Sequence, residues 1–112
     1  MGRTGGKNDS LPGSLDLLIL KTLSRGVLHG YGIVQAVKQA SGEEILIEEG
    51  SLYPALQRLE LNGWVEAEWG VSPSGRQARI YRITKSGRKQ LSVEARRYEQ
   101  LTLAIARVLA QE

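Results

Sequence analysis

Apolar side chains in the first half of the chain recur every three or four residues, which is the spacing of amphipathic helices. A first helix is expected to begin at Ser14, whose side chain can cap it. A second is expected over residues 31–41 and should end at Gly42. The short apolar segment at residues 45–47 fits either a strand or a buried turn.

A third helix is expected to begin at Ser51, which has the side chain of an N-cap. Pro54 then falls in the first turn, where its missing N–H breaks no helical bond. Asn62 and Gly63 tolerate the left-handed conformation and should end the helix. The buried face of this helix is predicted to consist of Leu52, Ala55, Leu56 and Leu59.

The pattern then changes to the period-two alternation of a β-strand. At residues 72–75 the segment SPSG places proline and glycine where a type I turn prefers them. Residues 78–83 are expected to return as a second strand, so the sequence predicts a β-hairpin. The apolar face of its first strand is formed by Val65, Ala67, Trp69 and Val71.

From residue 85 to about residue 111 the chain contains no proline and predicts one long helix with Thr84 as its N-cap. At about 1.5 Å per residue it would be roughly 40 Å long. So small a domain cannot cover such a helix, and its apolar residues repeat every seven positions, which favours pairing with a second copy. The alternative is an amphipathic helix that folds back on its own core. The predicted dimerisation residues are Leu91, Ala95, Tyr98, Leu101, Ile105 and Val108.

Three helices, a hairpin and a long helix follow one another in the order of a winged helix-turn-helix, whose third helix enters the major groove. The expected fold is mainly α (α+β), with a two-stranded β wing and a long C-terminal dimerisation helix. We expect a flexible N-terminal arm at residues 1–10, a DNA-binding domain at residues 11–83 and the dimerisation helix at residues 84–112.

The composition argues against several classes of protein. The 112 residues include no cysteine, which excludes disulfides, thiolate metal sites and cysteine nucleophiles. The longest apolar run, at residues 17–20, is too short to span a bilayer, and the N-terminus has no signal-peptide core. We find no nucleophile–base pair, phosphate loop or metal-ligand spacing. We therefore expect a soluble, cytoplasmic protein that is not an enzyme and has no metal or cofactor.

Charge is distributed unevenly, although the formal net charge is only +3. Residues 43–68 carry seven acidic and one basic side chain, and residues 76–107 carry nine basic and two acidic ones. The basic segment could form a nucleic-acid surface. The alternative is a solvated surface with intramolecular ion pairs. Acids near the third helix repel phosphate, so an alternative function is a protein-interaction winged helix without DNA binding.

Several motifs resemble the PadR family of transcriptional regulators. They are LPGSLDLLIL at residues 11–20, LHGYGI at residues 28–33, GSLYPALQRLE at residues 50–60 and YRITKSG at residues 81–87. The resemblance runs in the right order from about Leu11 to Leu91, and the tail is a single helix, as in the short branch of the family. The segment WVEAEWG at residues 64–70 is similar to a PadR subgroup from soil acidobacteria.

This resemblance implies a repressor that binds a pseudo-palindromic operator in double-stranded DNA as a homodimer through its C-terminal helix. Relatives respond to aromatic compounds, so a small aromatic effector is a further expectation. Trp64 and Trp69 could line its site at the dimer interface, or they could pack in the core or at the margin of the wing.

The candidate DNA-binding residues lie on the third helix and at the wing. Tyr53 could instead be a core aromatic, and Arg58 could be held in an ion pair with Glu60 or another nearby acid. Arginine can pair with guanine and glutamine with adenine, whereas wing arginines contact phosphate or the minor groove. The candidates are Ser51, Tyr53, Pro54, Gln57, Arg58, Arg76, Gln77 and Arg79.

Overall fold

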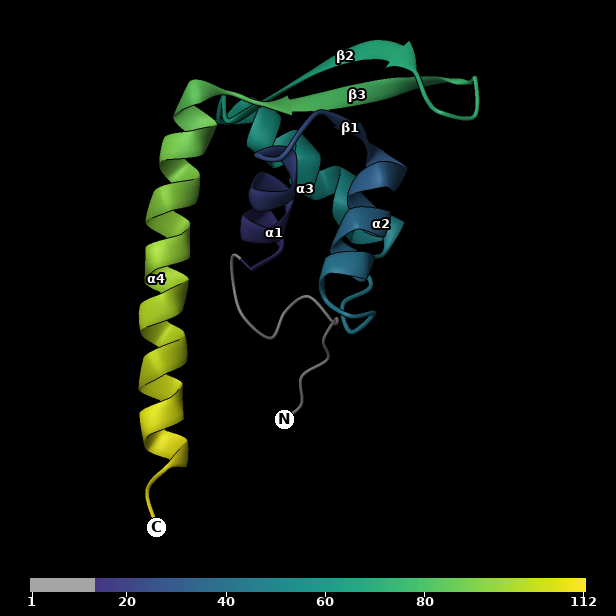
Figure 1. Cartoon of the computed structure of the whole chain (residues 1–112). Helices are drawn as coiled ribbons and strands as arrows, with labels where there is room; N and C mark the ends of the chain where they lie inside the picture. Colours follow the sequence, from purple (N-terminus) through teal and green to yellow (C-terminus); the bar gives the residue numbers. More distant parts are fainter. Residues whose placement is uncertain (1–13) are drawn as a thin grey trace.

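The computed structural model describes residues 14–112, which form three short helices, a small sheet and one long helix (Figure 1). This arrangement confirms the predicted mainly α winged helix-turn-helix. The expected N-terminal arm and the first residues of the LPGS motif lie outside the described residues. In chain order the elements are α1 Ser14–Leu23, β1 Leu28–His29, α2 Gly30–Ala40, α3 Glu49–Leu61, β2 Val65–Val71, β3 Gln77–Ile83 and α4 Lys85–Leu109.

The sheet is antiparallel and has the strand order β1-β3-β2. Strands β2 and β3 form the predicted wing, in register from Val65 opposite Ile83 to Val71 opposite Gln77. Its turn closes where expected, since the Gly75 N–H donates to the Ser72 carbonyl at 2.9 Å. Strand β1 adds a third, two-residue strand beside β3, which was not predicted because two residues are too few to show an alternating pattern.

The core lies between the helices α1 to α3 and one face of the sheet. The segment at residues 44–48 is irregular, which excludes the strand. Ile47 inserts into the core, but Ile45 and Leu46 are exposed, so the expected buried turn is correct for Ile47 alone. The buried apolar residues are Ile19, Leu20, Leu23, Ile33, Val37, Ile47, Leu52, Ala55, Leu56, Leu59, Val65, Tyr81 and Ile83.

The N-cap of helix α3 lies three residues before the predicted Ser51. The N-cap is Glu48, whose carbonyl accepts the N–H groups of both Ser51 and Leu52 at 2.9 Å. Ser51 therefore lies inside the first turn, and Pro54 lies within the helix rather than at its start. A proline there has no N–H for the carbonyl four residues before it, that of Gly50.

The end of α3 confirms the prediction for Asn62 and Gly63. Asn62 is the C-cap, and Gly63 takes the left-handed conformation with φ +75°. The Trp64 N–H then donates to the Leu59 carbonyl at 3.0 Å, the bond that completes a Schellman-type helix end.

Helix α4 begins at the predicted N-cap, where the Thr84 hydroxyl accepts the Gly87 N–H at 3.0 Å. The same hydroxyl donates to the Gly63 carbonyl at 2.7 Å, and that of Ser86 donates to this carbonyl at 3.0 Å. The Thr84 N–H donates to the Trp64 carbonyl at 3.0 Å. The start of α4 is thus tied to the turn that follows α3, after which α4 extends well beyond the helical body (Figure 1).

Candidate nucleic-acid interface

One side of α3 packs into the core and the other is open along its whole length. Ser51 is half-buried, and Leu61 is 87% exposed at the C-terminal end. Because the core side is apolar throughout, only the open side can meet a ligand. Its exposed residues are Glu49, Gly50, Tyr53, Pro54, Gln57, Arg58 and Leu61.

Tyr53 is both exposed and structural. Its ring is 45% exposed, yet its hydroxyl lies against Gly30, where an added Cβ would come within 2.5 Å of the Tyr53 oxygen. A side chain at residue 30 would therefore force Tyr53 to shift at this close approach between the first turns of α2 and α3. Tyr53 therefore holds the corner of the helix-turn-helix and still presents part of its ring to the outside.

Arg58 forms an ion pair, but its partner is Asp16 on α1 at 2.7 Å and not Glu60. The Arg58 side chain remains 55% exposed. An exposed ion pair contributes about 0–1 kcal/mol, whereas a bidentate pair with guanine is worth about 1–3 kcal/mol of discrimination. Arg58 can therefore exchange Asp16 for a base edge at little cost.

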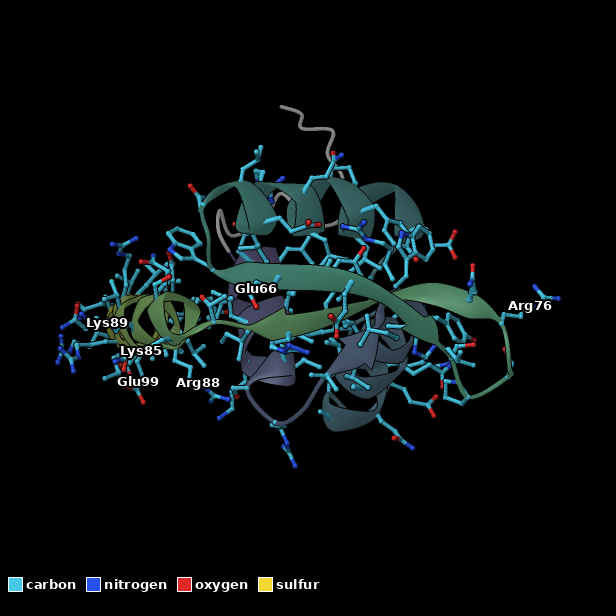
Figure 2. All side chains as sticks on the ribbon, turned by 90° about the horizontal axis from the view of Figure 1, so that it is seen from above. Glu66, Arg76, Lys85, Arg88, Lys89 and Glu99 are labelled. Carbon is cyan, nitrogen blue, oxygen red and sulfur yellow. The ribbon has the colours of Figure 1, made fainter. Side chains whose placement is uncertain are left out.

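The basic segment after residue 76 is partly neutralised within the protein. Arg79 pairs with Glu60 and Arg82 pairs with Glu68, each at 3.2 Å. Arg76 forms no ion pair with any residue from 14 to 112, and Figure 2 shows it projecting from the far end of the wing. The alternative of intramolecular ion pairs therefore holds for Arg79 and Arg82, whereas Arg76 makes no ion pair within the described part of the chain.

An open groove separates α3 from the wing. Tyr81 is the buried ionisable group at its base, and burial raises the pKa of its phenol above the ordinary value of 10.0. The Glu60 carboxylate raises that pKa further, and the Arg79 guanidinium opposes the rise. The groove contains one acid and one base, Glu60 and Arg79, which form an ion pair. It is lined by Tyr53, Pro54, Gln57, Glu60, Leu61, Arg79 and Tyr81.

The raised pKa of Tyr81 predicts a loss of stability in alkali. The unfolded chain releases the Tyr81 proton at about pH 10, before the folded chain does, so the stabilisation present below pH 10 is lost as pH rises through the folded pKa. We expect the fall in the free energy of unfolding above pH 10, measured by urea titration, to be shallower in Tyr81→Phe. Tyr31→Phe, at an exposed tyrosine, is the control; equal slopes for Tyr81→Phe and the native chain would contradict the prediction.

Helix α4 is covered only near its beginning. Leu91 is half-buried and packs against the core of its own chain, as the alternative reading proposed for the helix as a whole. From Ala95 to Leu109 every side chain is exposed, including the predicted Tyr98. An open apolar groove lies between α1 and α4. Further exposed apolar residues on α4, which the prediction did not include, are Val93, Leu103 and Leu109.

The two tryptophans have different environments. Trp64 is half-buried and packs against the core, as predicted. Trp69 is 66% exposed, so the prediction that it packs the margin of the wing is wrong. The physical reason is that the wing extends past the helical layer, and the apolar alternation continues beyond the core. Neither tryptophan is among the residues that line the α1–α4 groove.

Tyr31 and Gln35 are further exposed polar residues on α2, which the sequence pattern did not indicate. Tyr31 is exposed in the first turn of α2, and its hydroxyl accepts a hydrogen bond from Gln35 Nε2 at 2.8 Å. In a helix-turn-helix the first of the two helices crosses the DNA backbone, so both side chains are candidate phosphate contacts. The signal that could have identified them is a tyrosine directly after a glycine-marked helix start.

No helix within residues 14–112 has the length and apolarity needed to cross a membrane. In the same part of the chain, no cluster of three or more His, Asp or Glu side chains could hold a metal ion.

Comparison with known proteins agrees with this geometry. The model of the PadR-like family of transcriptional regulators matches residues 19–93. The transcriptional regulator Rv3488 of Mycobacterium tuberculosis is 35% identical over 85 residues, which are 76% of each protein.

Two solved structures are similar along most of their length. A transcriptional regulator from Clostridium thermocellum, Cth-833, has a TM-score of 0.79 and 30% identity, covering 93% of this chain and 100% of that one. A PadR family transcriptional regulator from Eggerthella lenta has a TM-score of 0.75 and 29% identity, covering 89% and 85%. The chain therefore belongs to the PadR-like family of transcriptional regulators, which are DNA-binding proteins and not enzymes.

Proposed function

We propose that the protein is a homodimeric repressor in which α3 of each protomer enters the major groove of a pseudo-palindromic operator. The observation that carries this proposal is the open side of α3, which lies beside a wing that ends in Arg76, a cation with no ion-pair partner among residues 14–112. A winged helix uses these two elements together, with the reading helix in the groove and the wing on the adjacent backbone.

The candidate residues divide by position. Ser51 and Tyr53 lie near the N-terminal end of α3, where free N–H groups and the helix dipole favour phosphate. Pro54 offers an apolar surface to a thymine methyl group, and Gln57 can read adenine. Arg58 is the candidate for guanine. On the wing, Arg76, Gln77 and Arg79 would contact the backbone or minor groove and supply affinity rather than sequence choice.

Dimerisation would occur through the uncovered face of α4. From Ala95 onward α4 carries exposed apolar side chains that nothing else in residues 14–112 buries, and an exposed apolar stripe of this kind is typical of a pairing surface. Two protomers related by a two-fold axis would place their reading helices on half-sites about one helical turn apart, roughly 34 Å. A small aromatic effector would bind in the α1–α4 groove, whose lining includes Leu17, Leu18 and Tyr98. Its binding would cause the protein to release the operator.

The proposal is tested by fluorescence anisotropy with labelled promoter DNA from beside the protein's own gene and with random DNA of equal length. We expect the promoter to be bound at least about 1,000-fold more tightly, the lower end for specific DNA-binding proteins. Equal affinity for both DNAs at moderate salt would refute sequence-specific binding. Absence of binding to either DNA even at low salt would instead support a protein-interaction winged helix.

The ion pair of Arg58 provides a paired test of its role. Arg58→Ala should weaken operator binding about tenfold or more and relax the preference for guanine at one position of each half-site. Asp16→Asn breaks the same ion pair and leaves the arginine in place. Asp16→Asn should retain or strengthen operator binding, because Arg58 no longer has to break an ion pair before it contacts DNA.

Competition with operators substituted at each position measures the affinity and the guanine preference of both variants. If Arg58 serves only the α1–α3 contact, the two variants will lose the same small amount of stability. In that case neither will change DNA affinity, and the assignment of Arg58 to a base will be wrong.

A further inference from the structure

The wing carries a large aromatic side chain that the core does not use. Trp69 and Val71 lie on the same face of β2 as the buried Val65, because alternate residues of a strand share a face. Trp69 is 66% exposed and Val71 69%. Two exposed apolar residues at this point contribute little to folding, so another explanation for their presence is needed.

The ring of Trp69 is held from one side by Arg79. The two residues are directly opposite in the β2–β3 register, and the Arg79 guanidinium carbon lies 5.7 Å from the centre of the indole ring. Arg79 also pairs with a residue of α3, since its Nη2 atom lies 3.2 Å from Glu60 Oε1. The chain Glu60–Arg79–Trp69 therefore sets the position of the exposed ring relative to α3.

Resting on the proposed DNA-binding function, we propose that Trp69 is a DNA-contacting residue of the wing. Its ring packs on deoxyribose and its N–H donates to a phosphate, on the strand next to the groove that α3 enters. Arg79, which is paired with Glu60, holds the ring in place, and Arg76 at the wing tip supplies positive charge to the adjacent backbone. This contact is independent of base sequence, and it fixes the wing against the duplex.

Charge identifies DNA as the occupant. The exposed apolar surface of Trp69 is flanked by the stacked guanidinium of Arg79, and Arg76, which has no ion-pair partner in the described part of the chain, lies at the wing tip. A surface that is both apolar and cationic matches the sugar–phosphate backbone, which offers apolar sugars between anionic groups. A second copy of this chain presents a different surface for pairing, the exposed apolar residues of α4.

The two tryptophans allow a direct test. In Trp64→Phe the indole of Trp69 is the only one, and its accessibility is measured by acrylamide quenching while the anisotropy of labelled promoter DNA reports binding. We expect the quenching constant to fall at least about twofold when DNA is bound. In Trp69→Phe the remaining indole, that of Trp64, should be unaffected by DNA. If Trp64→Phe fails to fold, subtracting the Trp69→Phe signal from that of the native chain gives the same quantity.

Each outcome separates the two proposals. Absence of DNA binding by the native chain would refute the proposed function itself. Bound DNA with an unchanged Trp69 quenching constant would overturn only the role of Trp69. If the Trp69 quenching constant falls without DNA as the protein concentration rises, the ring lies in a contact between copies of the chain. This result would also overturn the proposed role of Trp69.

Affinity gives a second readout that a structural role would not produce. Trp69→Ala should weaken promoter binding roughly tenfold without changing the slope of log affinity against log salt, because no charge is removed. Arg76→Ala should lower that slope by about two units, one for each protomer of the proposed dimer. Trp69→Phe should recover part of the lost affinity, since an aromatic face remains. A Trp69→Ala variant that binds as tightly as the native chain would contradict the proposal.

Discussion

Replacing Leu101 and Ile105 together by glutamate should convert the proposed dimer into a monomer and weaken operator binding about 100-fold or more. Both side chains are exposed on the part of α4 that its own chain does not cover. Glutamate is a good helix former, so the folded monomer should lose little stability. In the dimer, however, the two charges would be buried at a helix–helix contact.

The loss of DNA affinity follows from linkage between half-sites. When two reading helices are joined, the second half-site is bound at a high effective concentration, which raises overall affinity by about 100-fold to 10,000-fold. A monomer keeps all the contacts of α3 and the wing but loses this gain. The variant should therefore retain weak binding that no longer requires both half-sites.

Sedimentation velocity and anisotropy on full and half operators measure the two effects. Arg96→Glu is the matched control, because it changes the charge by the same two units on about the opposite face of α4. The control should remain dimeric. A double variant that sediments like the native dimer would show that α4 pairs through another face or does not pair at all.

Local signals in the sequence were sufficient for most of the fold. The ends of the helices could be predicted where one residue decides the backbone, as at Gly63, where the chain must adopt a left-handed conformation, and at Thr84, whose hydroxyl caps α4. The start of α3 could not. The N-cap position is occupied by Glu48, whose side chain makes no capping hydrogen bond, while Ser51 offers a stronger but misleading cap signal.

Long-range contacts explain what the sequence could not show at the candidate site. Arg58 pairs with Asp16, which is 42 residues away, and Arg79 pairs with Glu60 across the groove. Neither partner can be read from spacing along the chain. The alternation of apolar and polar residues placed Trp69 on the apolar face of β2 correctly. Such a pattern shows which face a side chain lies on, but it does not show how deeply the side chain is buried. Whether the core extends far enough to cover Trp69 depends on the lengths of the helices beneath the wing.

A glycine-to-alanine change at residue 87 should lower the free energy of unfolding by about 3 kcal/mol, the upper end of the range for overpacking. A Cβ at Gly87 would overlap the carbonyl oxygen of Trp64 and lie 2.8 Å from Cγ1 of Ile83. The carbonyl cannot easily retreat, because it accepts the Thr84 N–H at 3.0 Å and lies directly after the turn that ends α3. The damage is therefore expected at the junction that orients α4 relative to α3.

Gly50→Ala is the matched control, since it makes the same chemical change in another helix. A Cβ at Gly50 meets no atom within 4 Å, so alanine there should stabilise the protein by up to about 1 kcal/mol through its helix propensity. Urea unfolding at one fixed protein concentration, which a dimer requires, measures both variants. Equal stability of the two variants would contradict the account of Gly87.

The control carries a functional prediction of its own. If the first turn of α3 approaches the DNA backbone closely, the new methyl group of Gly50→Ala will weaken operator binding roughly tenfold, which corresponds to about 1.4 kcal/mol, although the protein is more stable. Gain of stability with loss of affinity is the combination that packing within the protein cannot produce, because the site is open space in the free chain. An alanine variant that binds the operator as tightly as the native protein would place the first turn of α3 away from DNA and move the reading contacts toward Gln57 and Leu61.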